Sequence, residues 1–378
     1  MALADIDKRP HTTFSRNRSA RTMLRRKIPS SFAPEDLARR ARLRYVTDQD
    51  PGLSRQRHGK GFSYLTTRGT PLQDPHKISR IEALAIPPAW RDVWICTVSA
   101  GHLQATGRDE RKRKQYLYHE RWQEVAGLAK FARLAAFGAQ LPALRRTIAA
   151  KLRGRALTRE RVLAGMVAVL DLTGIRVGNE EYVKENGSYG LASLRNRHVT
   201  IGPHSVELRF RAKGGFHRNV TIDAPAVVRL IRDSASLSGS HVFQYLDADE
   251  QIRGITATEV NGYLKTLTGE EITAKDFRTW KASSFAAGAL FAAAKGEEET
   301  VAGRKRTARE VVCQTAEMLS NTPAVCRNYY IHPGLLESYE QGTLRTDIGS
   351  ASRGSKRFSA DEQLLKRFLK SWKPALDR

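Results

Sequence analysis

The first part of the chain, from about residue 41 to residue 121, is divided into short segments that predict β-structure. Val93 and Ile95, and the stretch around His102–Leu103, have the apolar residues expected of strands. Clusters of turn-forming residues separate these segments, at Asp48–Gly52, Arg68–Pro71 and Pro87–Pro88. We therefore expect a small β-rich N-terminal domain over residues 41–121.

From about residue 122 the pattern changes to that of helices. Apolar residues recur three and four positions apart in Val162–Leu172 and again in Phe285–Ala294, and Ala and Leu become frequent. This spacing predicts a larger, mainly α-helical domain over residues 122–340. The chain as a whole is expected to have an α+β fold.

One predicted strand pair interrupts the helical part. Apolar and polar residues alternate from Val206 to Phe210 and again from Val220 to Ile222. Between these runs, Lys213-Gly214-Gly215 provides the residues of a turn. The pattern predicts a β-hairpin with a lysine near its tip.

Both ends of the chain are basic. Residues 1–33 hold eight Lys and Arg and little apolar periodicity, so we expect a basic arm over residues 1–40. Residues 341–378 form a Gly/Ser-rich stretch and then a predicted short helix around Ala360–Trp372, a basic C-terminal extension. No apolar stretch follows the first charges, and the longest apolar run has ten residues, about half of a membrane span. We expect a soluble intracellular protein with no membrane partner.

The balance of charge favours a polyanionic partner. The 378 residues include 64 Lys and Arg against 39 Asp and Glu, a formal net charge of +25. Nucleic acid is the usual partner of such a chain, although an anionic membrane or a ribosome would attract it as well. Charge supplies salt-dependent affinity but no reaction. A non-catalytic basic binding protein is therefore one hypothesis.

Sequence motifs for nucleotide cofactors and metals are absent. The chain has no G-x-x-x-x-G-K-[ST], no G-x-G-x-x-G after a strand and no H-E-x-x-H. Cys96, Cys313 and Cys326 lack C-x-x-C spacing, so we interpret them as buried reduced thiols rather than disulfides or zinc ligands. The sequence predicts neither a cofactor nor a metal.

Two basic stretches are candidates for contact with nucleic acid. In Arg108–Tyr118, five basic residues precede an amide and two tyrosines, which combines phosphate binding with groups that read or pack on bases. A solvated charge run is the alternative. The candidate contacts in this stretch are Arg113, Lys114, Gln115, Tyr116 and Tyr118. The second stretch, Arg145–Arg161, is compatible with DNA contact or with an exposed helix face.

Two arginines and a tyrosine have the residue types needed for phosphoryl transfer. Arg176 follows an apolar helix, Arg278 comes immediately before the Ala-rich helix, and Tyr330 lies in segment 321–333. Each alone is compatible with a structural role. Together, two guanidiniums can bind the non-bridging oxygens of a negative transition state, and a lysine can protonate the leaving deoxyribose oxygen. This set requires no metal, and a covalent tyrosine intermediate allows resealing without ATP.

These residues lie in motifs through which the sequence resembles the type IB DNA topoisomerases, specifically the compact branch of bacteria and poxviruses. Six motifs occur in order between about Arg44 and Pro333, and the two ends of the chain lie outside them. They are Ile86–Trp90, Gly101–Asp109, Lys114–Tyr118, Leu172–Glu180, Lys275–Trp280 and the segment of Tyr330. The resemblance implies a tyrosine recombinase/topoisomerase IB catalytic fold whose domains clamp duplex DNA. It also implies an isomerase that relaxes supercoiled DNA, without ATP or metal, as a monomer in the nucleoid-associated cytoplasm.

The resemblance also implies roles for particular residues. Tyr330 is expected to be the nucleophile that forms a 3′-phosphotyrosyl bond, with Tyr329 as a structural neighbour. Arg176 and Arg278 would form the guanidinium clamp, and Lys213 would be the general acid for the 5′-oxygen. Of the candidate DNA contacts above, the amide and the two tyrosines would touch the duplex near the cleavage site.

Asn321 is where the sequence departs from the family pattern. Many type IB enzymes have a histidine at this position, which donates to a non-bridging oxygen, and an amide can donate the same hydrogen bond. In one continuous helix, Asn321 and Tyr330 would be about 13 Å and half a turn apart. They could not then meet at one phosphate, so we expect the chain to bend between them, at Thr322–Pro323.

The nearest alternative enzyme class is the tyrosine recombinases, which share the catalytic residues. Those enzymes usually have H-x-x-R at the second arginine, whereas this chain reads Lys275-Asp-Phe-Arg278. The motifs of the N-terminal part are also similar to those of topoisomerases. The sequence therefore favours a topoisomerase over a recombinase or a non-catalytic binding protein.

Overall fold

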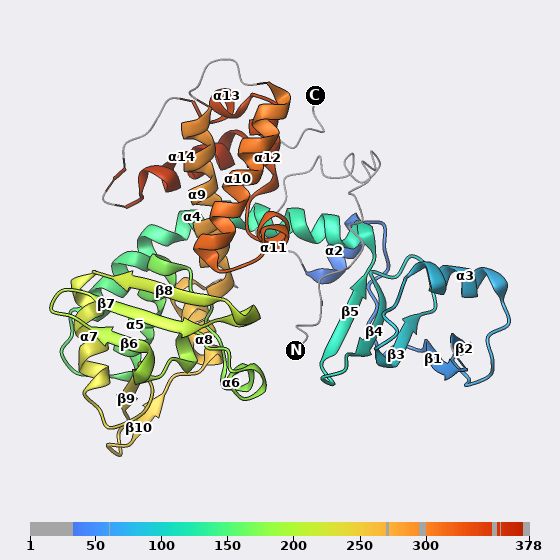
Figure 1. The fold of residues 1–378 in the computed structure, drawn as a ribbon, viewed down its shortest axis with the longest axis horizontal. Coiled ribbons are helices and arrows are strands. Elements are labelled where there is room, and N and C mark those ends of the chain that lie inside the picture. Colours follow the sequence, from blue (N-terminus) through green and yellow to red (C-terminus); the bar gives the residue numbers. More distant parts are fainter. Residues whose placement is uncertain are drawn as a thin grey trace, which may run out of the picture. The chain divides into compact units, whose positions relative to one another are not determined.

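The computed structural model describes residues 33–372, apart from residues 60, 270–271, 295–299, 350–353 and 356. Most of the predicted basic arm therefore lies outside the described residues. The chain divides into two compact units, one of residues 1–133 with 375–378 and one of residues 134–374. An N-terminal sheet and a larger helical part confirm the expected α+β class (Figure 1).

The first unit is built on a five-stranded antiparallel sheet in the order β2-β1-β3-β4-β5. The strands are β1 (Gly52–His58), β2 (Gly61–Leu65), β3 (Arg91–Cys96), β4 (Leu103–Arg108) and β5 (Lys114–Tyr118). Val93 and Ile95 lie in its core, packed with Ile81, so the strands predicted at both places are confirmed. Helices α2 (Pro34–Arg40) and α3 (Pro75–Ala83) complete the unit, together with the start of α4 (Glu120–Leu152).

Helix α3 was not predicted, although its start signal is local. Asp74 caps the helix by accepting hydrogen bonds from the backbone amides of His76 and Lys77, and Pro75 occupies the first helical position. The buried Ile81 then joins the helix to the core of the sheet.

The second unit is mainly helical and contains the predicted hairpin. Its strands are β6 (Val199–Ile201), β7 (Val206–Arg211) and β8 (His217–Ile222), which form one antiparallel sheet, and the pair β9 (Gln244–Leu246) and β10 (Ile252–Gly254). Its helices are the end of α4, α5 (Arg159–Thr173), α6 (Glu180–Asn186), α7 (Pro225–Ala235), α8 (Ala257–Thr268), α9 (Ala274–Ala293), α10 (Val301–Leu319), α11 (Pro323–Tyr329), α12 (Pro333–Glu340), α13 (Leu344–Ile348) and α14 (Ala360–Ser371). Within the residues described, no helix is both long and apolar enough to cross a membrane.

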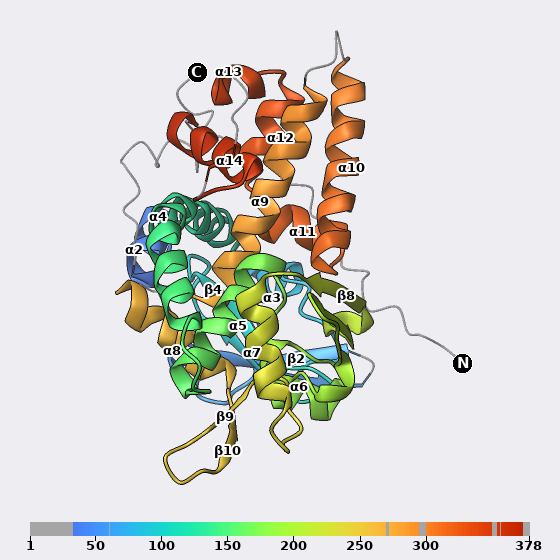
Figure 2. The ribbon, with the colours of Figure 1, turned by 90° about the vertical axis from the view of Figure 1, so that its left-hand side faces the viewer.

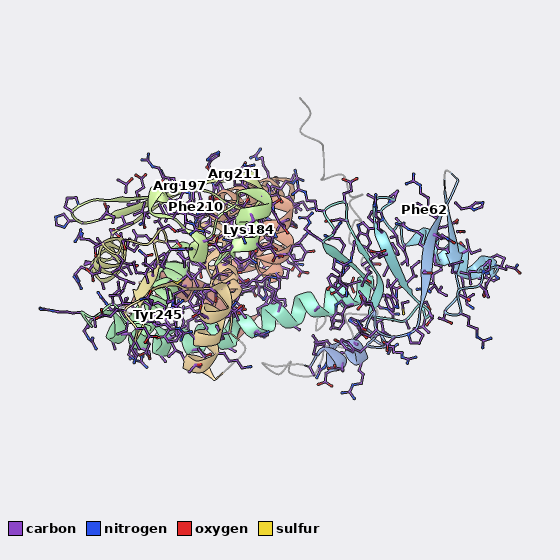
Figure 3. All side chains as sticks on the ribbon, turned by 90° about the horizontal axis from the view of Figure 1, so that it is seen from below. Phe62, Lys184, Arg197, Phe210, Arg211 and Tyr245 are labelled. Carbon is purple, nitrogen blue, oxygen red and sulfur yellow. The ribbon has the colours of Figure 1, made fainter. Side chains whose placement is uncertain are left out.

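The hairpin predicted from the alternation is present in β7 and β8. Leu208 pairs with Val220, and the turn at Lys213–Gly215 closes with a hydrogen bond of 2.7 Å from the Ala212 amide to the Phe216 carbonyl. Gly214 has φ of 82°, a left-handed conformation that glycine adopts at little cost. Figure 3 labels Phe210 and Arg211 at the end of β7, just before this turn.

Helix α9 is the centre of the C-terminal part of this unit, and Figure 2 shows it between α10 and α14. The helix begins at Ala274, where Thr273 and Asp276 form a capping box. Arg278 is therefore inside the helix, not before it as we expected. The helix predicted around residues 360–372 is confirmed as α14, which packs along α9.

A partly buried polar network joins α14 to α4, α5 and α9. The guanidinium of Arg145 forms ion pairs of 2.7 Å with both Asp171 and Glu362, and Glu362 also accepts a hydrogen bond of 2.8 Å from the indole of Trp280. In the same basic stretch, Arg161 is buried and paired with Asp233. The expectation of an exposed helix face is therefore wrong for Arg161, and Arg145 is partly buried and paired within the unit.

The cysteines are only partly as expected. Cys96 and Cys326 are buried, as predicted, whereas Cys313 is exposed on α10. The interpretation of all three as buried thiols is wrong at that position, because residue 313 falls on the solvent side of the helix.

We predict that Glu362→Gln lowers the free energy of unfolding by on the order of 2 kcal/mol, because it removes a charged acceptor from a partly buried network. Burial alone would raise the pKa of Glu362, but its hydrogen bond and charge interaction with Arg145 lower it below 4.5. The wild-type advantage should thus be complete above pH 4.5 and lost as the pH falls. Denaturant unfolding of wild type and Glu362→Gln at pH values from 7 to below 4.5 measures the difference in stability. Glu310→Gln, at an exposed position, is the control. Equal stability of wild type and Glu362→Gln at pH 7 would contradict the prediction.

Candidate active site

Two helices of the second unit end next to each other and leave carbonyl groups free. Helix α5 stops at Thr173, where Gly174 takes a left-handed φ of 63°, and α10 stops at Leu319, where Ser320 has φ of 48°. The last carbonyls of a helix have no partner within it and carry partial negative charge. They are natural acceptors for cationic side chains.

Three arginines bind these carbonyls in turn. At the end of α10, Arg218 donates to the Met318 carbonyl, Arg278 to that of Leu319 at 3.0 Å, and Arg176 to that of Ser320 at 3.2 Å. At the end of α5, two of the same arginines bind again, Arg218 to the Thr173 carbonyl at 2.9 Å and Arg278 to that of Gly174. We call these three side chains the arginine cluster.

The arginine cluster concentrates positive charge, with Arg278 buried and Arg176 and Arg218 partly buried. Burial, and then repulsion by Arg176, lower the pKa of Arg278 and of Arg218 to about 10, and burial also lowers the pKa of Arg176. All three guanidiniums remain charged at neutral pH. The carbonyl and hydroxyl oxygens that they bind carry no full negative charge. The cluster therefore favours the binding of an anion.

Tyr330 lies against this cluster. It follows α11, its side chain is only 9% exposed, and the guanidinium carbon of Arg278 is 5.0 Å from the centre of its ring. Burial alone would raise the pKa of Tyr330, but the charges of Arg278 and Arg176 and a hydrogen bond from Arg278 outweigh it and lower the pKa below 10. The neighbouring Tyr329 is 54% exposed, so the two tyrosines have different environments.

The backbone on both sides of Tyr330 is fixed by one serine. The Ser283 hydroxyl, buried on α9, donates to the Tyr330 carbonyl at 3.0 Å and accepts from the His332 amide at 3.0 Å. Burial lowers the pKa of His332 to about 3, and its neutral ring accepts from the Gly334 amide to cap α12. Helix α9 thus supplies both Arg278 and the serine that holds the Tyr330 segment.

Asn321 lies at the expected bend between α10 and α11. Its Oδ1 accepts from the Thr322 amide at 3.1 Å. Its Nδ2 is buried and has no hydrogen-bond partner within the described part of the chain. A buried donor without a partner is costly, so this amide is suited to an acceptor brought by a ligand.

Arg176 is held by a close approach of two backbone segments. The amide of Leu191 donates to the Arg176 carbonyl at 2.9 Å, and that of Ala192 to the Val177 carbonyl at 2.7 Å. Gly178, with φ of 70°, lies so near Gly190 that a Cβ on it would be 2.6 Å from the Gly190 Cα. Only glycine fits there, which explains the glycine two residues after Arg176.

Lys213 is not placed in the arginine cluster. Its side chain is exposed at the turn between β7 and β8, and its amine lies 5.3 Å from the centre of the Tyr182 ring in α6. The structure therefore brings together Arg176, Arg278 and Tyr330, places Asn321 directly after Ser320, and leaves Lys213 on a neighbouring turn.

The candidate DNA contacts lie in the first unit, along the edge strand β5. Lys114 and Tyr116 are exposed, and Tyr116 stacks on Tyr118 with ring centres 6.0 Å apart. Two of the basic groups have acidic partners, Lys114 with Asp48 at 2.5 Å and Arg113 with Asp109 at 2.7 Å. The amide of the remaining candidate, Gln115, also donates to Asp109, at 2.9 Å.

Comparison with known proteins agrees with this geometry. Residues 119–348 match the family described as eukaryotic DNA topoisomerase I, catalytic core, and residues 61–109 match bacterial DNA topoisomerase IB, N-terminal domain. The DNA topoisomerase 1B of Acanthamoeba polyphaga mimivirus is 32% identical over 296 residues, 76% of this chain and 88% of that protein. The chain belongs to the type IB DNA topoisomerase family.

As a type IB topoisomerase, the chain is an isomerase that acts on double-stranded DNA, and the recombinase alternative is not favoured. The catalytic-core match includes the arginine cluster, Lys213, Asn321 and Tyr330, whereas α14 lies beyond it. The candidate DNA contacts at residues 113–118 fall between the two matched ranges.

Two residues of the site were missed in the sequence. Arg218 lies on β8 at the same parity as Val220 and Ile222, the alternation that marks the inner face of the strand. A charge at such a position is a signal of a buried role. Ser283 has no comparable signal, because serine is unremarkable in a helix rich in small residues.

We predict that Arg278→Gln raises the pKa of Tyr330 above its wild-type value, because burial then acts with less opposing charge. Titration of tyrosines labelled with ¹³C at Cζ, with the Tyr330 signal assigned by Tyr330→Phe, measures the change. Arg209→Gln, an exposed arginine on β7 paired with Glu207, is the control and should leave the signal unchanged. A Tyr330 pKa that is the same in Arg278→Gln as in wild type would show that Arg278 does not lower it.

Proposed function

We propose that this topoisomerase relaxes supercoiled duplex DNA by transient cleavage of one strand, with Tyr330 as the nucleophile. The observation that carries the proposal is the contact of the Tyr330 ring with the guanidinium of Arg278, next to Arg176, in a buried and positively charged site. A lowered pKa favours the phenolate, which is the reactive form of the nucleophile.

In the proposed reaction, the phenol oxygen of Tyr330 attacks the phosphorus of a phosphodiester. A bond forms between this oxygen and phosphorus, the bond from phosphorus to the 5′-oxygen breaks, and a 3′-phosphotyrosyl linkage results. The phenol proton leaves to solvent, and Lys213 gives a proton to the 5′-oxygen. Arg176 and Arg278 stabilise the charge on the non-bridging oxygens.

Asn321 is proposed to donate a hydrogen bond from its unpartnered Nδ2 to one of the same oxygens. Its lack of a partner among the described residues supports this role, because a phosphate would satisfy the buried donor. The 5′-hydroxyl then attacks the phosphotyrosine in the reverse reaction and reseals the strand. Between the two steps the duplex rotates and loses supercoils.

Lys213 must approach the phosphate for this reaction. Its position on an exposed turn with two glycines of positive φ, Gly214 and Gly215, supports such a movement. Nothing but an aromatic ring contact holds its amine at Tyr182 among the interactions described. We propose that bound DNA draws the amine to the 5′-oxygen.

The first unit is proposed to hold the duplex through Arg113, Lys114, Gln115, Tyr116 and Tyr118. The exposed Tyr116 ring and Lys114 amine on the edge strand β5, with the exposed Arg113 just before it, support this role. The ion pairs with Asp48 and Asp109 must then exchange for phosphate contacts, which moderates the gain in affinity. We further propose that the enzyme acts as a monomer closed around DNA, in the nucleoid region of the cytoplasm.

Relaxation of a negatively supercoiled plasmid tests the function as a whole. We expect relaxation in EDTA and without ATP, since the proposed reaction uses only side chains of the chain. A site-specific recombinase would instead rearrange only DNA that carries its own sites, and a binding protein would shift the plasmid without relaxing it. Failure to relax plasmid under these conditions would refute the proposal.

We predict that Tyr330→Phe abolishes the covalent protein–DNA adduct, whereas affinity for duplex stays within a few-fold because many basic contacts supply it. Tyr329→Phe is the matched variant, since it removes the neighbouring hydroxyl from an exposed ring. It should form the adduct at close to the wild-type rate. A reversed result, with the adduct lost only in Tyr329→Phe, would show that the nucleophile is the other tyrosine.

We predict that Lys213→Ala cleaves ordinary DNA at least 10²-fold more slowly. It should regain most of this loss on DNA whose 5′-bridging oxygen is replaced by sulfur, because sulfur leaves without a proton. Arg176→Ala should be rescued much less, because the proposed role of Arg176 is on the non-bridging oxygens. Single-turnover cleavage of both substrates measures the difference. The same rescue in both variants would contradict the assignment of Lys213 as general acid.

A further inference from the structure

Arg218 has no role in the reaction proposed above, although it belongs to the arginine cluster. It lies on β8, paired across the hairpin with the buried Phe210, five residues after Lys213. Arg218 is partly buried, and withdrawing its charge from water costs free energy unless hydrogen bonds replace the lost solvation. The hydrogen bonds of Arg218 show which segments it connects.

One guanidinium joins three segments of the chain. From β8, Arg218 donates to the Thr173 carbonyl at the end of α5, to the Met318 carbonyl in the last turn of α10, and to the Ser320 hydroxyl at 3.3 Å. Ser320 has φ of 48°, an uncommon conformation for a residue other than glycine. Arg218 therefore binds α10 at the point where the helix stops and the chain turns toward Asn321.

Both terminal nitrogens of the Arg218 guanidinium donate to protein oxygens. Its Nη1 serves Met318 and Ser320, and its Nη2 serves Thr173. Asn321, by contrast, has an amide nitrogen with no partner among the described residues. Arg218 therefore has contacts that hold the site together, whereas the Asn321 amide is available to bind a phosphate oxygen.

We propose that Arg218 is a positioning residue that fixes the end of α10, and through Ser320 the direction of the Asn321 amide toward the phosphate. The inference rests on the proposed role of Asn321 in the active site. It assigns Arg218 no direct contact with the reacting atoms. Arg176 shares the effect, because its acceptor is the Ser320 carbonyl.

A double-mutant cycle in single-turnover cleavage at saturating enzyme tests this. We expect Arg218→Gln to slow cleavage by about 10-fold to 10²-fold, and Asn321→Ala by about 10²-fold to 10³-fold, the usual effect of one lost transition-state donor. The double variant should be within about threefold of Asn321→Ala, because an amide that is absent cannot be misdirected. Effects that multiply in the double variant would overturn the proposal.

Arg218→Lys separates position from charge, and it serves if the glutamine variant does not fold. It keeps the positive charge, and Arg218 borders a cavity of about 670 Å³ that gives the new side chain room. An ammonium cannot span the three acceptors as a guanidinium does. We expect cleavage slowed at least fivefold, with the same lack of additivity toward Asn321→Ala. A wild-type rate in Arg218→Lys would show that charge alone is needed.

The substrate with sulfur at the 5′-bridging position supplies a readout that a loss of stability would not change. Because the proposed effect is on a non-bridging oxygen, sulfur should not rescue Arg218→Lys. Rescue equal to that of Lys213→Ala would show that Arg218 acts through the hairpin lysine instead, and would overturn the proposal.

Arg232→Gln is the matched control. Arg232 also binds two carbonyls, those of Gly202 at 3.0 Å and Pro203 at 3.1 Å, but these belong to the loop between β6 and β7. Its removal should leave cleavage unchanged, and an equal loss in this variant would overturn a specific role for Arg218. Adduct formation by Tyr330→Phe is measured in the same series. An adduct there refutes the proposed active site, whereas multiplying effects without one refute only the role of Arg218.

Discussion

Positive charge gathered at two helix ends, buried at Arg278 and partly buried at Arg176 and Arg218, is the constraint on which the rest of the second unit depends. Three guanidiniums repel one another there, and the partial charges of carbonyls at the ends of α5 and α10 offset part of this repulsion. Helix ends can do so because their last carbonyls are free and point along the axis. The two helices must therefore stop where they do. Gly174 and Ser320, both with positive φ, mark these stops.

The same arrangement determines the environment of Tyr330. A buried tyrosine ordinarily resists ionisation, but here the neighbouring guanidiniums reverse the shift. Helix α9 connects the arginine cluster to Tyr330, because it carries both Arg278 and Ser283. The Ser283 hydroxyl binds the backbone of the tyrosine. The position of α9 is in turn fixed by α14 through Glu362 and Trp280. Helix α14 lies beyond the catalytic-core match. It thus supports the site indirectly, by packing on α9.

Much of this could be predicted from the sequence, where the signal is local. The alternation around Lys213 gave the hairpin, and the distance along a helix between Asn321 and Tyr330 required the bend that α10 and α11 show. The start of α9 was placed too late, because the Ala-rich run hid the capping box at Thr273 and Asp276. What could not be predicted is long-range: Arg218 and Ser320 are 102 residues apart, and no pattern in either segment refers to the other.

The site of covalent attachment tests the account most directly. The adduct with DNA can be trapped, digested with nuclease and trypsin, and the remaining nucleotide located by mass spectrometry in the peptide of residues 328–345. That peptide contains three tyrosines, at positions 329, 330 and 339. We expect a nucleotide joined through its 3′-phosphate to Tyr330 alone. Attachment to either of the other two tyrosines, to a residue outside this peptide, or through a 5′-phosphate would contradict it.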